Sequence, residues 1–367
     1  MKSIGFVGYR GMVGSVLVER MIQENDFSKI NTYFFSSSSA GSSAPDTINS
    51  HNTLLDAYSV DALTDMDIIL SCQGGDYTNL MRPKLEESGW KGFWIDAASS
   101  LRMKDDSIIV LDPLNDHAIQ NGFEKGIKNY IGGNCTVSLL LLSLGGLLKE
   151  DLVDWVSSMT YQAASGAGAK NMTELLKQYD FYSNKFNENI SDSILEIERK
   201  LNSSVLKDSF PKSEFGHSLG FNLLPWIDSE LENGQSKEEW KAQVEANKIL
   251  GKSGSLKIDG TCVRVSSMRS HAQGLTIKLK KSVDLKTINE LIEDHNKWVK
   301  LIPNHKEDSL KSLCPQAVSG TLDIPIGRVR KMTLGDDYLN AFTVGDQLLW
   351  GAAEPLRRTL IKLLNWL

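Results

Sequence analysis

The chain has 367 residues, and at about 150 residues per domain this length favours two domains over a single core. Its 40 Lys and Arg residues against 46 Asp and Glu residues give a formal net charge of −6, which argues against nucleic acid as a partner. Apolar residues at 41% and charged residues at 23% are typical of a soluble globular protein and exclude a disordered or fibrous chain.

No segment of the sequence predicts a membrane span or a secretion signal. The longest apolar run, residues 139–148, contains Ser143, Gly145 and Gly146 and is much shorter than the roughly 20 residues that a span needs. The N-terminus leads directly into a strand and a glycine turn, so no signal peptide is expected there. We therefore expect a cytoplasmic protein without a membrane partner.

The first third of the chain alternates between strand and helix patterns. Residues 4–8 predict a strand, and residues 13–22 carry apolar side chains at helical spacing. Further strands are predicted at residues 30–35, 67–72, 92–95 and 108–111, with helical segments between them. This alternation predicts an α/β fold with a parallel, doubly wound sheet over about residues 1–133.

The pattern changes after Asn134. A helix is predicted at 136–148, a strand at 155–162 and charged amphipathic helices up to about residue 206. The remaining predictions are paired strands at 259–267 and 273–280, a helix at 284–299 and a helical pattern at 344–367. Together they indicate a second, α+β domain. Within the last segment, Gly351-Ala352-Ala353 predicts close packing against another element.

A glycine motif joins the first strand to the first helix. Gly8, Gly11 and Gly14 form a G-x-x-G-x-x-G turn, in which backbone N–H groups at a helix N-terminus can bind a pyrophosphate. Such glycines also occur where a helix and a strand simply pack closely. The motif thus predicts a dinucleotide site, with tight packing as the alternative.

The end of the second strand indicates which dinucleotide would bind. NAD enzymes usually place an Asp or Glu there for the ribose 2′-hydroxyl, whereas this chain has serines at positions 36–39. Serine hydroxyls, with Arg10 in the neighbouring turn, could instead accept a 2′-phosphate, which predicts NADP. A flexible serine loop is the alternative interpretation.

Cysteine usage points to a reactive thiol. The four cysteines include no C-x-x-C pair, and no histidine stands at zinc-finger spacing, so neither a disulfide framework nor a metal site is expected. Cys135 follows two glycines and Asn134 at the predicted start of an apolar helix, where the helix dipole favours the thiolate. A small buried apolar residue is the alternative; Cys72, Cys262 and Cys314 lie in or beside strand-like sequence and are expected to be structural.

Proton transfer and charge recognition have weaker candidates. His271 is the histidine that we would pair with Cys135, because a thiolate reaction needs a group that exchanges protons near neutral pH. Five other histidines compete with it: His51, His117, His217, His295 and His305. Glu238 and Lys241 are three residues apart and share one helical face, which could equally be a solvated charged surface.

Taken together, these residues resemble bacterial aspartate-semialdehyde dehydrogenases over almost the whole chain. The matching blocks are residues 8–14, 72–77, 96–103, 133–136, 161–166 and 344–351. The resemblance implies a Rossmann-type NADP-binding domain at residues 1–133, completed by a C-terminal helix at about 350–367. It also implies an α+β catalytic and dimerisation domain at residues 134–349, and a homodimer.

The resemblance also implies a role for each matching residue. Cys135 would be the nucleophile, His271 the acid/base and Gln162 the group that orients the acyl intermediate. Arg264 and Glu238 would clamp the substrate's carboxylate and ammonium groups, and Arg102 and Lys241 would bind its phosphate or the released inorganic phosphate. The matching cofactor positions are Arg10, Gly11, Met12, Val13, Ser37, Ser38, Gln73, Ser165, Gly166 and Gln347.

The activity implied is the NADPH-dependent conversion of L-4-aspartyl phosphate into L-aspartate 4-semialdehyde and phosphate. That reaction belongs to the biosynthesis of lysine and diaminopimelate, methionine and threonine. The alternatives are a reductase of N-acetylglutamyl phosphate type and a catalytically inactive nucleotide-binding homologue. The sequence departs from close relatives around His271, in the serine run at 36–43 and in the tail at 361–367.

Overall fold

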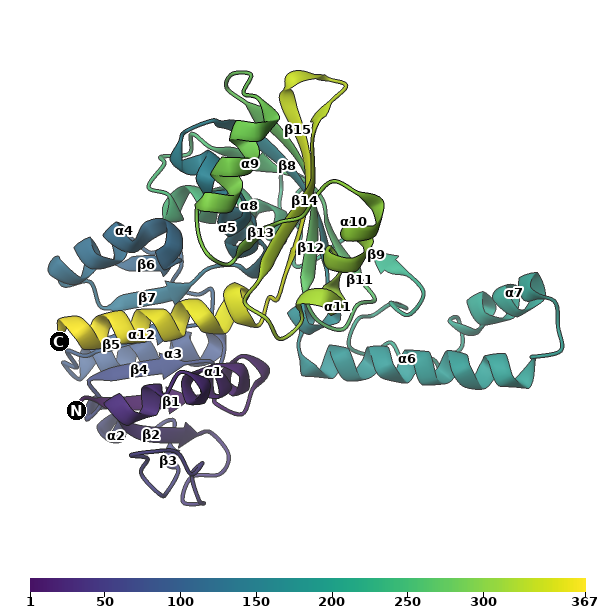
Figure 1. Ribbon diagram of the computed structural model, residues 1–367. Coiled ribbons are helices and arrows are strands. Elements are labelled where there is room, and N and C mark those ends of the chain that lie inside the picture. Colours follow the sequence, from purple (N-terminus) through teal and green to yellow (C-terminus); the bar gives the residue numbers. More distant parts are fainter.

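The computed structural model describes all 367 residues and contains two β-sheets with helices packed on both (Figure 1). One sheet is formed by the first third of the chain. The second is formed by the rest, from which an arm of two helices, α6 (Ala169–Glu188) and α7 (Ile194–Ser204), extends away from the first sheet. None of the helices is both long and apolar enough to cross a membrane.

The first sheet has seven parallel strands in the order β3-β2-β1-β4-β5-β7-β6. The strands are β1 (Ser3–Val7), β2 (Asn31–Ser36), β3 (Leu55–Asp56), β4 (Ile68–Ser71), β5 (Phe93–Asp96), β6 (Ser107–Val110) and β7 (Asn129–Gly132). The predicted doubly wound α/β sheet is confirmed, with β3 and β7 as additional strands. The strand order reverses between β1 and β4, and in open α/β sheets the carboxyl ends of the strands at such a reversal are where ligands bind.

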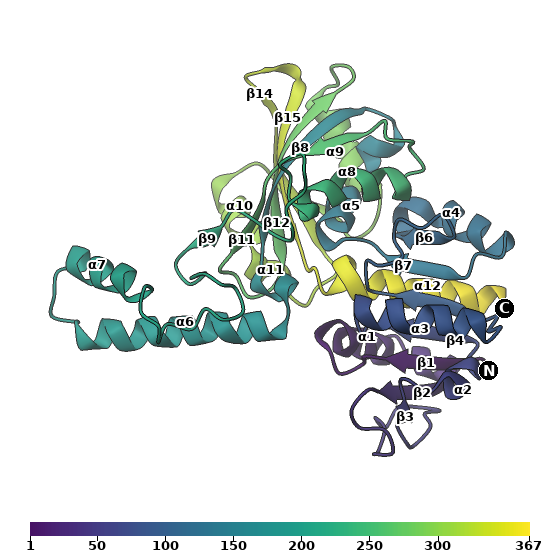
Figure 2. The same cartoon turned by 180° about the vertical axis from the view of Figure 1, so that it is seen from behind.

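Helices cover both faces of this sheet. They are α1 (Met12–Gln23), α2 (Val60–Thr64), α3 (Gly75–Glu87), α4 (Asp112–Glu124) and, from the end of the chain, α12 (Glu354–Trp366). Leu356, Leu360 and Leu363 of α12 are fully buried in the same core as β1, β5 and α1, while α2 and α3 pack on the opposite face, seen from behind in Figure 2. The C-terminal helix therefore belongs spatially to the first sheet.

Ion pairs fix α12 beside α1. Arg357 of α12 bonds to Asp26 at 2.6 Å and to Glu354 at 3.0 Å, and Arg20 of α1 bonds to Glu354 at 3.0 Å. Both carboxylates are almost completely buried, so loss of one arginine would leave a buried charge without its partner.

The second sheet is mixed, in the order β13-β14-β15-β12-β8-β11-β9, with β10 also paired to β8. The strands are β8 (Val153–Gln162), β9 (Leu223–Leu224), β10 (Lys257–Asp259), β11 (Cys262–Val265), β12 (His271–Leu279), β13 (Val299–Leu301), β14 (Ile324–Met332) and β15 (Gly335–Gly345). β8 lies between β11 and β12, parallel to the first and antiparallel to the second. The predicted pairing of 259–267 with 273–280 is therefore wrong.

Three helices cover the face of this sheet that is turned toward the first sheet: α5 (Cys135–Lys149), α8 (Lys237–Ile249) and α9 (Leu285–Asp294). Nearly every side chain of α5 is buried, and its leucines form the centre of the larger core. Two short helices, α10 (Lys306–Ser312) and α11 (Pro315–Val318), complete the domain.

Two predicted helices are shorter than their sequence patterns, and one cysteine lies in a different element. The helix predicted at 284–299 ends at Asp294, because the Asn296 side chain accepts the N–H groups of Trp298 and Val299 ahead of β13. In the 344–367 segment, Val344 and Gly345 belong to β15, and the helix begins only after a π-helical turn at Leu349–Ala353. Cys314 caps α11 and is not beside a strand.

The strand registers bring distant residues to one edge of the second sheet. Gln162, the last residue of β8, pairs with Arg264 of the parallel strand β11. His271, the first residue of the antiparallel strand β12, pairs with Gly345 at the end of β15. This edge also holds the N-terminus of α5 and faces the start of α12.

Candidate active site

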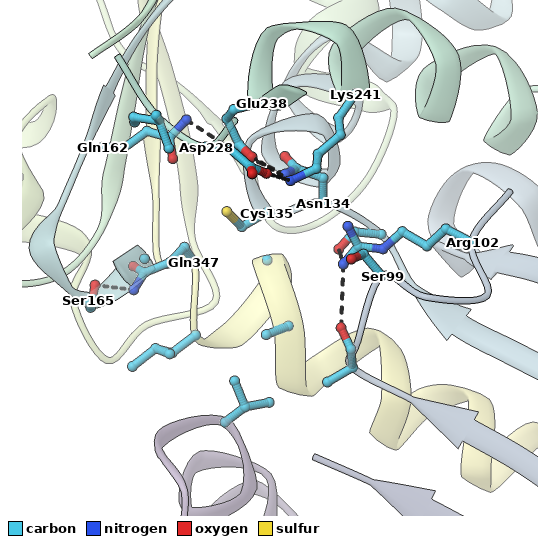
Figure 3. A pocket seen from close by; sticks show the side chains of 18 of the residues that line it. Ser99, Arg102, Asn134, Cys135, Gln162, Ser165, Asp228, Glu238, Lys241 and Gln347 are labelled. Carbon is cyan, nitrogen blue, oxygen red and sulfur yellow. Dashed lines mark hydrogen bonds and ion pairs between the residues drawn. The ribbon is translucent and has the colours of Figure 1, made fainter. Parts of the chain in front are cut away.

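A cavity of about 440 Å³ lies between this edge of the second sheet and the first sheet (Figure 3). Ten of the residues predicted from the sequence line it: Val13, Arg102, Cys135, Gln162, Ser165, Gly166, Glu238, Lys241, Arg264 and Gln347. The fold thus brings into one wall residues that are more than 300 positions apart.

Cys135 is the first residue of α5, and its sulfur lies in the middle of the cavity in Figure 3. Asn134 caps the helix, because its side-chain oxygen accepts the N–H groups of Thr136 and Val137. On the other side, a Cβ on Gly351 would lie 2.7 Å from the Cβ of Cys135. The close packing predicted at Gly351 is therefore a contact with the thiol-bearing residue itself.

The surroundings of Cys135 favour the neutral thiol. Burial raises its pKa to about 12, and the nearby Glu238 carboxylate adds to the effect. Arg102, Arg264 and the N–H of Thr136 act in the opposite direction. The helix N-terminus does favour the thiolate, through the N–H of Thr136, but desolvation of the charged sulfur outweighs it and raises the net pKa.

Glu238 accepts hydrogen bonds from three polar side chains in the cavity wall above Cys135. One carboxylate oxygen accepts the side-chain amides of Asn134 at 2.9 Å and Gln162 at 3.3 Å, and the other accepts Lys241 at 3.0 Å. Burial tends to raise the pKa of Glu238, but Lys241 and the three hydrogen bonds outweigh it and hold the pKa below its ordinary value. Glu238 is therefore a buried, ionised carboxylate.

Lys241 has a second partner that the sequence analysis missed. The carboxylate of Asp228, in the loop before α8, lies 2.7 Å from the Lys241 ammonium (Figure 3). No local motif marks Asp228, which reaches the cavity only because its loop folds back over α8. The neighbouring carboxylates raise the pKa of Lys241 against the opposing effect of burial, so that the ammonium stays charged.

Arg102 is held by the backbone and by one more unpredicted carboxylate. Its guanidinium donates to the carbonyl oxygens of Gly132 at 2.6 Å, Gly133 at 3.1 Å and Ala97 at 3.4 Å. Its Nη1 donates to Glu245 of α8 at 3.1 Å, and Glu245 also accepts the backbone N–H of Asn134 at 2.7 Å. Since a guanidinium has five N–H groups, one N–H on Nη1 remains for a ligand.

Arg264 and His271 lie beneath Gly166, where a Cβ would come within 2.7 Å of Arg264 Nη1 and 3.1 Å of His271 Nε2. Arg264 Nη1 donates to the carbonyl oxygen of Ala163 at 2.8 Å. His271 is completely buried and does not line the cavity. The structure therefore places it next to Arg264 and does not bring it into the wall beside Cys135.

The protonation of His271 follows from its contacts. The backbone N–H of Ala163 donates to Nδ1 at 3.0 Å, so the neutral ring carries its proton on Nε2, which has no hydrogen-bond partner. Burial and the charge of Arg264 lower its pKa to about 3. In the empty site His271 is thus a neutral hydrogen-bond donor.

Arg269, the other arginine near His271, has a different environment. It pairs with the buried carboxylate of Asp346 at 2.8 Å. Next to Asp346, Gln347 accepts the N–H of Ser270 at 2.8 Å and donates to Ser165 (Figure 3). Arg269 therefore supports the turn after β15, while Arg264 is the arginine exposed to the cavity.

A separate cluster forms at the carboxyl ends of β1, β2 and β4, and we call it the serine corner: Arg10, Ser36, Ser37, Ser38, Ser39 and Gln73. Arg10 donates to Ser36 at 3.0 Å, Ser38 at 3.1 Å and Ser39 at 3.3 Å, and Gln73 donates to Ser37 at 3.3 Å. The serine run is hydrogen-bonded to this arginine and is not a free loop. The role of Ser36, which also accepts the N–H groups of Ser38 and Ser39, was not predicted.

The glycine motif explains how the corner is built. Gly8 has φ +78°, and a Cβ there would lie 2.6 Å from the backbone of Cys72, so only glycine lets the turn after β1 touch the turn after β4. A Cβ on Gly14 would lie 2.3 Å from the Gly8 oxygen. Gly11 and Met12 follow at the start of α1. Tight packing and an open helix N-terminus therefore occur together, and the two interpretations of the motif do not exclude each other.

Comparisons with known proteins agree with this architecture. Residues 3–122 match the family model described as "Semialdehyde dehydrogenase, NAD binding domain", and residues 144–350 match "Semialdehyde dehydrogenase, dimerisation domain". A solved aspartate semialdehyde dehydrogenase from Francisella tularensis is 53% identical over 99% of this chain and 100% of its own, with a TM-score of 0.96.

More distant solved structures share the fold. Aspartate semialdehyde dehydrogenase II of Vibrio cholerae, complexed with ASA, is 22% identical over 100% of this chain and 98% of its own, with a TM-score of 0.80. The Candida albicans enzyme, solved with NADP, is 15% identical over 100% of both chains, with a TM-score of 0.67. With an NAD(P)-binding domain, a dimerisation domain and a full-length relative at 53% identity, the chain belongs to the aspartate-semialdehyde dehydrogenase family.

Proposed function

We propose that the protein is an NADP-dependent, phosphorylating aspartate-semialdehyde dehydrogenase, which converts L-4-aspartyl phosphate into L-aspartate 4-semialdehyde and phosphate. The observation that carries this proposal is the cavity in which Cys135, Gln162, Glu238, Lys241 and Arg264 converge from four segments of the chain. The full-length relative named aspartate semialdehyde dehydrogenase supports the choice of substrate. The same reaction would supply lysine, diaminopimelate, methionine and threonine biosynthesis.

Cys135 is the nucleophile in this proposal. Its thiolate attacks the acyl carbon, the C–O bond to phosphate breaks, and a thioester forms on the sulfur. Because the pKa of the thiol is about 12 in the empty site, the thiolate must form as the substrate binds. A substrate ammonium beside Glu238 would favour it, since it neutralises the carboxylate that helps to raise this pKa. Gln162, already fixed by Glu238, would hold the acyl oxygen.

Charged side chains would orient the substrate around Cys135. The ionised Glu238 suits the substrate's ammonium, and the guanidinium of Arg264 suits its carboxylate. Lys241 and the remaining N–H of Arg102 would bind the phosphate. The buried charge of Glu238 disfavours the alternative substrate N-acetylglutamyl phosphate, whose acetylated amine carries no ammonium to pair with it.

The serine corner fits the 2′-phosphate of NADP. Arg10 is surrounded by hydroxyl groups, and no carboxylate is among its hydrogen-bond partners, so it is free to pair with a phosphate. The other cofactor positions would be Gly11, Met12, Val13, Ser37, Ser38, Gln73, Ser165, Gly166 and Gln347. When bound, NADPH supplies the hydride that reduces the acyl carbon.

We assign His271 to proton handling on the oxygen of the reduced intermediate. Its Nε2–H has no hydrogen-bond partner, and Gly166 places no side chain over it, where a Cβ would lie 3.1 Å away. Acting as a true acid requires a second proton on the ring, which the contact with Ala163 opposes at Nδ1. The bound substrate must therefore either raise the pKa of His271 or release the ring from Ala163.

We also propose a homodimer and the domain boundary at residue 133. On β8, Met159 and Tyr161 are exposed on the face opposite to Val156, which packs in the core. The matched family model is described as a dimerisation domain, which supports a second copy of this chain as the partner for that face.

One assay tests the proposed activity. NADPH formation is followed by absorbance with aspartate semialdehyde, phosphate and NADP, and in parallel with N-acetylglutamate semialdehyde. Turnover with the unacetylated substrate alone, dependent on phosphate, is the expected result. Turnover with the acetylated substrate would favour the reductase alternative, and no turnover with either would favour an inactive homologue.

A further inference from the structure

The charges in the cavity are balanced before any ligand enters. Its cations are Arg102, Lys241 and Arg264, and the carboxylates that face them are Glu238, Asp228 and Glu245. With His271 neutral, these charges cancel. Arg264 is therefore the only cation of the cavity without a carboxylate partner, and the proposed function assigns it to the substrate's carboxylate. Inorganic phosphate must bind to a cation that is already paired.

Two of the three carboxylates are held firmly. Glu238 and Glu245 lie on α8, are 6% and 2% exposed, and each accepts a hydrogen bond from Asn134. Moving either one would leave a buried charge without partners and would disturb the cap of the helix that begins at Cys135. Neither carboxylate is suited to make room for a phosphate.

Asp228 differs from these two carboxylates in its position and its exposure. It lies in the loop between β9 and α8, its side chain is 33% exposed, and Lys241 is the only residue with which it forms an ion pair, although the charge of Lys237 also helps to lower its pKa. The other hydrogen bond of its carboxylate is local and comes from the N–H of Ser229 at 2.8 Å. Asp228 can therefore leave Lys241 for solvent without leaving a buried charge behind.

The position of Asp228 on Lys241 is also where a phosphate oxygen would bind. The 2.7 Å contact has the length of a charge-assisted hydrogen bond, and Lys241 retains Glu238 at 3.0 Å on its other side. A phosphate on Lys241 beside an unmoved Asp228 would bring two anions into contact. One of them must leave.

We propose that Asp228 is a specificity-determining residue that occupies the phosphate position on Lys241 and is displaced when inorganic phosphate binds. The proposal rests on the proposed function, in which Lys241 binds phosphate. Asp228 then weakens phosphate binding in one direction of the reaction and, by returning to Lys241, promotes phosphate release in the other.

A merely structural role for Asp228 predicts the opposite effect. If Asp228 only held Lys241 in place, its removal would loosen the ammonium and weaken phosphate binding. If Asp228 competes with phosphate, its removal strengthens phosphate binding. The sign of the change therefore separates the two roles.

The test is the Asp228→Asn variant, assayed with aspartate semialdehyde, inorganic phosphate and NADP varied separately. We expect KM for phosphate to fall by about threefold to fivefold, the upper part of the range for losing a partly exposed ion pair, with KM for the semialdehyde within about twofold. Asp61→Asn, which removes one exposed negative charge in α2, is the matched control and should change neither constant. An unchanged or raised KM for phosphate in Asp228→Asn would overturn the proposal.

A binding measurement makes the inference independent of turnover. Inorganic phosphate alone should protect Cys135 from iodoacetamide, and half-protection should require less phosphate in Asp228→Asn than in the wild type. The same midpoint in both proteins would refute the role of Asp228. A wild type that makes no NADPH would instead refute the proposed function, whatever the protection midpoints show.

Discussion

The serine corner and the catalytic cavity hold charge in opposite ways. In the corner, the hydrogen-bond partners of Arg10 are all hydroxyl groups, and Arg10, Ser37, Ser38 and Gln73 are exposed. In the cavity, every cation except Arg264 already has a carboxylate partner, and most of the side chains are buried. A substitution of Arg10 therefore removes the one charge of the corner, whereas a substitution in the cavity also leaves the partners of the lost side chain without a counter-charge.

Removing the nucleophile should have the largest effect: it should abolish turnover in the cavity and leave cofactor affinity, which depends on the serine corner, unchanged. Cys135→Ala should lower turnover by about 10⁴-fold or more, because the thioester can no longer form. Affinity for NADPH, measured by its fluorescence on binding, should stay close to that of the wild type since no residue of the serine corner changes. Comparable activity in the variant, or an equal loss of NADPH affinity, would contradict this separation.

The next effect concerns His271. In His271→Asn, kcat should fall by about 10²-fold because the proton-handling group is lost, with little change in KM. The pKa of about 3 in the empty site predicts that the profile of kcat/KM, which reports the free enzyme, shows no ionisation of His271 between pH 5 and 8. A limb near pH 6.5 that disappears in the variant would show that the ring is not held neutral.

The two arginines near His271 should then differ from each other. Arg264→Leu should raise KM for the semialdehyde by about 10-fold to 100-fold, because a guanidinium bonded to a carboxylate contributes about 1.5–3 kcal/mol. Arg269→Leu is the matched control; Arg269 pairs with Asp346, so its loss should affect stability more than this KM. If Arg269→Leu alone raised the KM, our assignment of the carboxylate clamp would be wrong.

The smallest effect should come from the serine corner. Wild type should prefer NADP to NAD by about tenfold in kcat/KM, or roughly 1.4 kcal/mol, and Arg10→Ala should remove most of this preference by weakening NADP alone. Steady-state kinetics with both cofactors measure it. An equal loss with NAD would mean that Arg10 acts on the pyrophosphate or on the loop and not on the 2′-phosphate.

The serine corner was predictable because its residues lie in short turns at the ends of consecutive strands. Gly8, Arg10 and the serines could be placed together once β1 and β2 were recognised as parallel neighbours. The glycines before Cys135 likewise predicted a helix start, and α5 begins at that residue. Local patterns thus predicted the parallel sheet and the start of α5.

The rest depended on contacts that no local pattern encodes. Glu245 meets Arg102 only because α8 packs beside that arginine, and Asp228 meets Lys241 only because of the path of the loop before α8. The insertion of β8 between β11 and β12 requires pairing across about 100 residues, which alternating polarity does not specify. The pKa of Cys135 depends on burial by all its neighbours, which outweighs the favourable effect of the helix N-terminus that the sequence predicted.

The return of α12 to the first sheet has a consequence for how this chain is synthesised. A ribosome releases β1–β7 long before it reaches Leu356, Leu360 and Leu363, which fill the core on one face of that sheet. The nascent first domain therefore exposes part of one apolar face until α12 has been translated. Gly351, which packs on Cys135, is translated just ahead of these leucines, so the thiol pocket and the first domain are completed at the same stage of synthesis.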